Sequence, residues 1–153
     1  MNKNLAITCI FGLIAITLGA FTTQGLQDVL TTREMSSLET GIRYQIYHVI
    51  VLLFVNTHSS FSIKLKNYVS YVFFFGIVLF SGSIYSIHIF NFPAKSIWFV
   101  TPMGGLLFLI GWVLMTHFFL FKIIKKKINK IISDSSCLKI MINFALVITN
   151  KNY

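Results

Sequence analysis

Residues 97–121 read IWFVTPMGGLLFLIGWVLMTHFFLF and contain no Asp, Glu, Lys or Arg. A helix needs about 20 apolar residues to cross the hydrocarbon core of a bilayer, so this run is long enough to span one. A backbone in lipid must satisfy its own hydrogen bonds, and the run lacks the alternation of a barrel strand. The stretch therefore predicts a transmembrane helix and an all-α membrane protein.

Three earlier runs, residues 5–22, 41–56 and 68–90, are also mainly apolar. The connecting segments 23–35, 57–67 and 91–96 are short, which favours antiparallel neighbours. We therefore expect a four-helix up-down transmembrane bundle over residues 1–121. The first run could instead be a signal peptide, but Leu18-Gly19-Ala20 offers only one of the two small residues that cleavage needs, which favours an uncleaved helix.

The composition agrees with a protein covered by lipid. Hydrophobic residues make up 56% of the chain and charged residues 11%, whereas a soluble domain carries about 25% charged residues. The net charge is +9, and seven of the thirteen basic residues lie from Lys122 onward. A basic cluster beside an apolar span is typical of a segment that fixes membrane orientation and contacts lipid, so we expect the bilayer and no nucleic acid as partner.

The basic residues also predict the orientation. With Lys3 and the loop 57–67, the Lys/Ile-rich tail of residues 122–153 places ten basic residues on one side of the membrane, against three on the other. This count predicts that both termini are cytoplasmic, and it depends on the tail. The tail itself is expected to be cytoplasmic or interfacial.

The second run is short, and its helix is expected to begin in the preceding linker. Two segments fit a capping box, Thr31 with Glu34 and Ser36 with Glu39. Either start gives a helix long enough to cross. Glu39 and Arg43 would then lie one turn apart, in the order that favours an ion pair.

Polar residues gather on one face of this second helix. Gly41, Tyr44, Gln45 and His48 follow the spacing i, i+3, i+4 and i+7. Polar groups inside a membrane are costly, so a functional pocket is one hypothesis, with His48 as a proton or ligand site. The alternative is a neutral histidine that donates one hydrogen bond to a neighbouring helix. The candidate polar pocket consists of Tyr44, Gln45, His48, Ser81, Ser83 and Tyr85.

Small residues in the spans predict close helix contacts, because they let backbones approach. Thr101 and Gly105 form one such pair, at a spacing of four. Pro102 either kinks a helix that begins at residue 97 or is tolerated in its first turns. The glycines expected to serve helix packing are Gly19, Gly76, Gly82, Gly104, Gly105 and Gly111.

The sequence offers little catalytic chemistry. It contains no recognisable nucleophile–base set, metal-ligand spacing or glycine-rich phosphate loop, and we expect neither an enzyme nor a cofactor. Cys9 and Cys137 are far apart and predict no disulfide or zinc site. The apolar cores contain no carboxylate of the kind that proton-coupled transport commonly uses, which weakens the transporter hypothesis.

Four short motifs follow one another over residues 5–117. They are Gly19-Ala20-Phe21 with Gly25-Leu26, Glu39-Thr40-Gly41 with Tyr44-Gln45 and Tyr47-His48, Gly76-Ile77 with Leu79-Phe80-Ser81-Gly82-Ser83 and Tyr85, and Thr101-Pro102 with Gly104-Gly105 and Gly111-Trp112. In these motifs the chain resembles the DUF423 (UPF0382) family of small bacterial membrane proteins. The resemblance implies four transmembrane helices in the bacterial inner membrane, and it implies no activity.

The chain departs from the family pattern in two places. The first motif of the family usually continues as Gly-Ala-His-Gly-Leu, whereas Thr22, Thr23 and Gln24 precede Gly25 here, so the histidine is lost. The family also usually ends soon after the fourth helix, which makes the tail an extension.

Three functions follow as hypotheses. The first is a structural or accessory membrane protein whose polar faces serve packing. The second is a small transporter or channel subunit with a polar pocket around His48, acting on an unknown ion or small molecule. The third, a membrane enzyme, lacks a catalytic set. A second copy of the chain is a further partner to be considered, since small four-helix proteins often dimerise.

Overall fold

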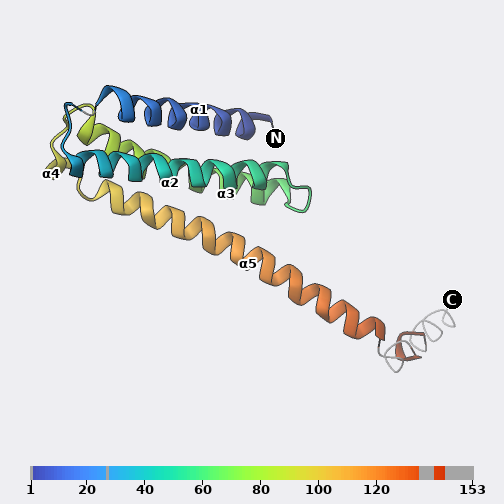
Figure 1. Cartoon of the computed structure of the whole chain (residues 1–153). Coiled ribbons are helices and arrows are strands. Elements are labelled where there is room, and N and C mark those ends of the chain that lie inside the picture. Colours follow the sequence, from blue (N-terminus) through green and yellow to red (C-terminus); the bar gives the residue numbers. More distant parts are fainter. Residues whose placement is uncertain (1, 27, 135–139, 144–153) are drawn as a thin grey trace. The chain divides into compact units, whose positions relative to one another are not determined.

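The computed structural model describes residues 2–26, 28–134 and 140–143, and the regular structure in these ranges is helical (Figure 1). The chain divides into two compact units, residues 1–113 and 114–153. In the described part, four helices are long and apolar enough to cross a membrane. They pack as an up-down bundle, which confirms the predicted fold class.

Helix α1 (Asn2–Gly25) and helix α2 (Thr32–Thr57) contain the first two predicted spans. Thr31 is the N-cap of α2, and its hydroxyl accepts a hydrogen bond from the backbone N–H of Glu34 at 3.4 Å. The Glu34 carboxylate accepts in return from the backbone N–H of Thr31 at 2.9 Å. This reciprocal pair is the first of the two predicted capping boxes. Ser36 lies inside α2 and starts no helix.

Helix α3 (Ile63–His88) begins at the N-cap Ser62, whose hydroxyl accepts from the N–H of Leu65 at 3.3 Å. After α3 the chain turns through Asn91, which adopts a positive φ of 53°. Asparagine tolerates this left-handed conformation better than most residues.

The fourth predicted span is divided differently from the sequence expectation. A one-turn helix α4 (Ala94–Ile97) precedes helix α5 (Val100–Asp134). Pro102 is the third residue of α5, where its missing N–H would have no intrahelical partner in any case. Of the two outcomes considered for Pro102, the structure therefore shows the tolerated first-turn proline.

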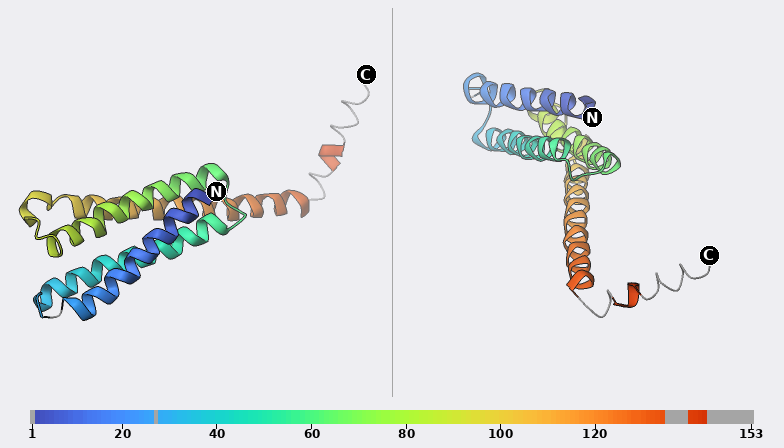
Figure 2. Two further views of the ribbon diagram at one scale, coloured as in Figure 1. Left: turned by 90° about the horizontal axis from the view of Figure 1, so that it is seen from above. Right: turned by 90° about the vertical axis from the view of Figure 1, so that its right-hand side faces the viewer.

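Helix α2 packs against both α1 and α3, and α1, α2 and α3 lie beside one another in Figure 2. One buried cluster consists of Leu38 and Ile42 from α2 with Ile84 and Tyr85 from α3. Aliphatic side chains and the Tyr85 ring fill this contact. Gln45 and His48, the buried polar residues in the middle of α2, are held between helices.

Two glycines of α5 and one of α3 lie where these two helices approach each other closely. A Cβ on Gly104 would lie only 2.7 Å from the Phe80 Cα atom of α3. A Cβ on Gly111 would lie 2.7 Å from Phe73 Cζ, and one on Gly76 would lie 2.7 Å from Phe108. At Gly104 the added atom would meet the backbone of α3, so the observed packing requires glycine there, whereas at Gly76 and Gly111 it would meet phenylalanine rings, which would have to shift.

The remaining predicted packing glycines are in looser surroundings. A Cβ on Gly19 would make an ordinary 3.8 Å contact with Ile42, and one on Gly105 would lie 4.0 Å from Phe80. A Cβ on Gly82 would meet nothing within 4 Å. Space alone does not require glycine at these three positions.

Helix α5 continues without a break across residue 121, where the sequence analysis ended the transmembrane domain. The described beginning of the tail is therefore helical as far as Asp134. The cytoplasmic or interfacial position of the tail stays a prediction. Residues 135–139 and 144–153, including Cys137, lie outside the described residues.

Candidate functional site

Gln45 lies at the meeting point of three helices. Its amide nitrogen donates to the backbone carbonyl of Phe11 in α1 at 2.7 Å. Its amide oxygen accepts from the Tyr85 hydroxyl of α3 at 2.9 Å. Only 1% of the residue is exposed. Its amide therefore forms its hydrogen bonds with the two neighbouring helices and not with solvent.

The two serines of the candidate pocket point to different partners. Ser81 donates from its hydroxyl to the backbone carbonyl of Gly41 at 2.7 Å and so joins α3 to α2. Ser83 lies 2.6 Å, oxygen to oxygen, from the Thr101 hydroxyl and so joins α3 to α5. A side chain on Gly41 would press against Ile84 and Tyr85 at 3.2–3.4 Å. The glycine therefore helps Ser81 to reach the α2 backbone.

His48 is buried among aromatic rings. Its Nδ1 atom is 2.7 Å from the Tyr44 carbonyl oxygen one turn earlier. Because a carbonyl can only accept, Nδ1 must carry the hydrogen, and in the neutral ring Nε2 is then the acceptor. The ring stacks on Phe108 with centroids 3.6 Å apart and planes 9° apart, and it also faces Phe73 at 5.0 Å. Among the described residues, Nε2 has no hydrogen-bond partner.

A cavity of about 620 Å³ lies beside His48, between α2, α3 and the first turns of α5. Its walls are mainly aromatic and aliphatic, and few of its groups can form hydrogen bonds. Such a lining suits an apolar molecule better than a hydrated ion. The lining residues are Tyr44, His48, Phe80, Pro102, Gly105, Leu106, Phe108, Leu109 and Trp112.

The structure does not bring the six predicted pocket residues to one cavity. Tyr44 and His48 line the large cavity. Gln45 and Tyr85 line a separate one of about 150 Å³ on the side of α2 that faces α1. Ser81 and Ser83 line neither of the two. The predicted polar face of α2 is therefore divided: Tyr44 and His48 face the cavity toward α5, whereas Gln45 faces the cavity toward α1.

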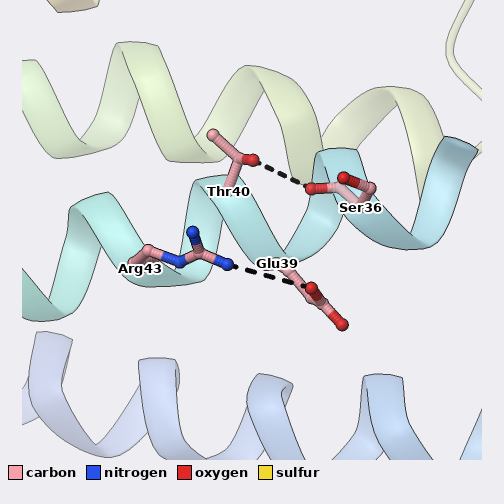
Figure 3. Close-up of polar contacts among 4 residues, drawn as sticks. All are labelled: Ser36, Glu39, Thr40 and Arg43. Carbon is pink, nitrogen blue, oxygen red and sulfur yellow. Dashed lines mark hydrogen bonds and ion pairs between the residues drawn. The ribbon is translucent and has the colours of Figure 1, made fainter.

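A third cavity, of about 310 Å³, lies between α1 and α2. Arg43 Nη2 is 3.9 Å from Glu39 Oε2, which confirms the predicted ion pair (Figure 3). Thr40 points away from this pair and donates to the backbone carbonyl of Ser36 at 2.9 Å. The cavity is lined by Gly19, Thr22, Thr23, Glu39, Ile42, Arg43 and Ile46.

One buried polar cluster escaped the sequence analysis. The Asn56 side-chain amide donates to the Ser70 hydroxyl at 2.8 Å, and the Lys66 ammonium donates to the backbone carbonyl oxygen of Asn56 at 2.8 Å. These residues are at most 6% exposed. The available signal was Asn56 itself, since an amide at the end of an apolar run must find partners.

Potential metal ligands are scattered over residues 2–26, 28–134 and 140–143. In these ranges no three His, Cys, Asp or Glu side chains come together in a way that could hold an ion. The one cysteine described, Cys9, is exposed on α1 and free. The geometry of the bundle thus offers hydrogen bonds between helices, an aromatic cavity and an ion pair beside a groove.

Comparison with known proteins identifies relatives over the transmembrane part. The family model "Protein of unknown function (DUF423)" matches residues 18–105. A UPF0382 membrane protein of Haemophilus influenzae is 36% identical over 118 residues, which cover 76% of this chain and 92% of the relative. The UPF0382 inner membrane protein YgdD of Escherichia coli K12 is 38% identical over 112 residues, covering 72% of this chain and 84% of the relative. No solved structure matches.

The matched residues extend from the end of α1 to the first turns of α5, and they include Gln45, His48 and the Glu39–Arg43 pair. The family model covers more than half of the chain, and the relatives cover nearly three quarters or more of it. With four membrane-spanning helices, the chain is a multi-pass protein of the bacterial inner membrane. It belongs to the DUF423 (UPF0382) family.

Proposed function

We propose that this chain is a structural or accessory membrane protein, without enzymatic activity, whose buried polar side chains join its helices. The proposal rests on the hydrogen bonds of Gln45. Its amide nitrogen donates to the backbone of α1, and its amide oxygen accepts from the Tyr85 hydroxyl of α3. Apolar helices gain little from contacting one another rather than lipid, so hydrogen bonds and close packing drive their association. A glutamine used in this way stabilises the bundle and is not free to bind a solute.

The other polar groups of the same helices support this proposal. The Ser81 hydroxyl donates to the backbone of α2, and the Ser83 hydroxyl is hydrogen-bonded to the Thr101 hydroxyl of α5. Asn4 of α1 donates to Asn67 of α3 at 2.9 Å near the opposite end of the bundle. Each of these bonds joins two different helices, which is the pattern expected when polar residues serve assembly.

The test compares two neighbouring buried substitutions. Gln45→Leu should lower the amount of folded protein in the membrane and its melting temperature, because it removes both interhelical bonds and leaves the Tyr85 hydroxyl unpaired. His48→Leu should lower both quantities less than Gln45→Leu does, because the hydrogen bond it removes lies within one helix and leucine keeps an apolar contact with Phe108 in place of the stacked ring. If His48→Leu reduced folded protein and Gln45→Leu did not, the assembly role of Gln45 would be refuted.

A second candidate function is a small transporter or channel subunit that uses the cavity beside His48. Two observations favour it, the cavity of about 620 Å³ and the His48 Nε2 atom, which has no partner among the described residues. An acceptor held inside an aromatic wall could receive a hydrogen bond from a bound molecule or take up a proton. The aromatic lining limits this candidate to apolar molecules or to protons passed along transient waters.

Proton flux into vesicles separates the two candidates. Purified protein in liposomes with a trapped pH-sensitive dye is compared with His48→Leu and with His58→Leu, a histidine at the exposed end of α2. The transporter candidate predicts flux in the wild type that only His48→Leu abolishes. The accessory proposal predicts the same background rate for all three proteins.

A further inference from the structure

We propose that the groove between α1 and α2 binds the headgroup of a phospholipid that carries both a phosphate and a primary ammonium, as phosphatidylethanolamine does. The groove is the cavity of about 310 Å³ beside the Glu39–Arg43 pair. This inference does not depend on the function proposed above, since a lipid site could serve either candidate.

Thr22 gives the first evidence for a ligand. It lines the groove and is only 1% exposed, and its hydroxyl has no hydrogen-bond partner among the described residues. A buried hydroxyl left without a partner is destabilising, because it has lost its hydrogen bonds to water. Thr23, its neighbour, instead donates to the backbone of its own helix, to the Ala20 carbonyl at 3.0 Å. Thr22 therefore leaves one unsatisfied hydroxyl buried in the wall of the groove.

The two charged side chains give the second evidence. Arg43 and Glu39 are 3.9 Å apart at their nearest atoms, which is well beyond the usual 2.7–2.9 Å of a charge-assisted hydrogen bond. Their side chains are 57% and 51% exposed. Both side chains line the groove between α1 and α2, and Figure 3 shows the Arg43 guanidinium directed toward the Glu39 carboxylate. Each can therefore accept a further partner without breaking a tight pair.

The charges match a headgroup of both signs. The guanidinium of Arg43 suits a phosphate, to which it can present two parallel N–H donors. The Glu39 carboxylate, one helical turn away, suits an ammonium that can donate an N–H bond. A purely anionic headgroup would bring a second negative charge close to Glu39. A choline headgroup has a cation but no N–H to donate.

The position of the groove fits the edge of the bilayer. Thr22 ends the apolar run of α1, so its level is where hydrocarbon gives way to headgroups. A long arginine side chain can extend toward that level while its stem stays among apolar groups. Gly19, Ile42 and Ile46 form the apolar part of the lining, where acyl chains would lie. A phosphate without acyl chains would lose that contact.

The test measures lipid binding to the full chain in detergent by native mass spectrometry. Phosphatidylethanolamine, phosphatidylglycerol and phosphatidylcholine with identical acyl chains are titrated separately. We expect phosphatidylethanolamine to bind about tenfold more tightly than the other two, the difference that one charge-assisted bond gives. Equal binding of the three lipids, or a preference for phosphatidylglycerol, would overturn the proposal.

Two variants resolve the roles of the charges. Arg43→Gln should weaken phosphatidylethanolamine binding about tenfold, through loss of the phosphate contact. Glu39→Gln should remove the preference for phosphatidylethanolamine over phosphatidylcholine. Arg33→Gln, an exposed cation at the start of α2 that does not line the groove, is the control and should bind as the wild type does.

Both groove residues are more than half exposed, so their substitution should preserve the fold, which circular dichroism checks. A preference that survives in both groove variants would contradict the assignment. If either variant lost its helical spectrum, the proposal would be judged from the three lipid titrations of the wild type.

Discussion

The Tyr85 hydroxyl of α3 donates to the Gln45 amide oxygen of α2 across 2.9 Å, while the same amide donates to the α1 backbone. Forty residues separate the two side chains in sequence. In lipid, such a bond is worth more than an apolar contact, because lipid itself supplies apolar contacts equally well. The relationship explains how a chain rich in exposed apolar residues can still specify which helices are neighbours.

The contact of α3 with α5 should depend on Gly104. Gly104→Ala would place a methyl group 2.7 Å from Phe80 Cα, so the two backbones must separate. Overpacking of this kind costs about 1–3 kcal/mol. Equilibrium unfolding in mixed detergent should show a lower free energy of unfolding for this variant.

Gly82→Ala is the matched control, because its added methyl group would meet nothing within 4 Å. Alanine is the better helix former by about 1 kcal/mol, so this variant should be as stable as the wild type or more so. A Gly104→Ala protein that matched Gly82→Ala in stability would show that the close approach of α3 and α5 does not exist.

The first turn of α2 should depend on Thr31. Thr31→Ala removes the hydroxyl that accepts from the Glu34 N–H, and the carboxylate loses a hydroxyl donor at 2.7 Å. Loss of an N-cap typically costs about 0.5–2 kcal/mol. Amide hydrogen exchange should become faster in residues 32–35.

Ser36→Ala tests the same claim from the other side. Ser36 begins the capping box that the structure does not use, and it lies inside α2. The substitution should leave exchange at the start of the helix unchanged. Faster exchange in Ser36→Ala than in Thr31→Ala would move the start of α2 to the second box.

Both termini should face the cytoplasm. In a chain with Cys9 and Cys137 replaced by alanine, a cysteine at Asp28 lies between α1 and α2, and one at Ser60 lies between α2 and α3. An impermeant maleimide added to intact spheroplasts should label Asp28→Cys at once and Ser60→Cys only after lysis. The opposite pattern would invert the orientation. The Lys/Ile-rich tail would then lie outside the cytoplasm.

The sequence was sufficient for the elements and insufficient for their contacts. The length of the apolar runs predicted four spans, and local rules predicted the Thr31 capping box and the Glu39–Arg43 pair, because these depend on residues at most four apart. The last apolar run was expected to begin at residue 97, whereas the chain forms the separate turn α4 first and α5 begins at Val100.

The candidate site shows the same limit. Helical spacing correctly put Tyr44, Gln45 and His48 near one another on α2. It could not show that Gln45 bonds to α1 and α3, or that His48 packs against Phe108 of α5. Those partners depend on how helices rotate against each other. Side-chain volumes across three elements decide that rotation, and spacing within one helix does not.

The central claim is that a polar side chain in the membrane holds three helices together, and a double-mutant cycle tests it most directly. The free energy of unfolding is measured for the wild type, Gln45→Leu, Tyr85→Phe and the double variant. A hydrogen bond between the two residues predicts a coupling free energy of about 0.6–1.7 kcal/mol. Effects that simply add, with no coupling between Gln45 and Tyr85, would contradict the account.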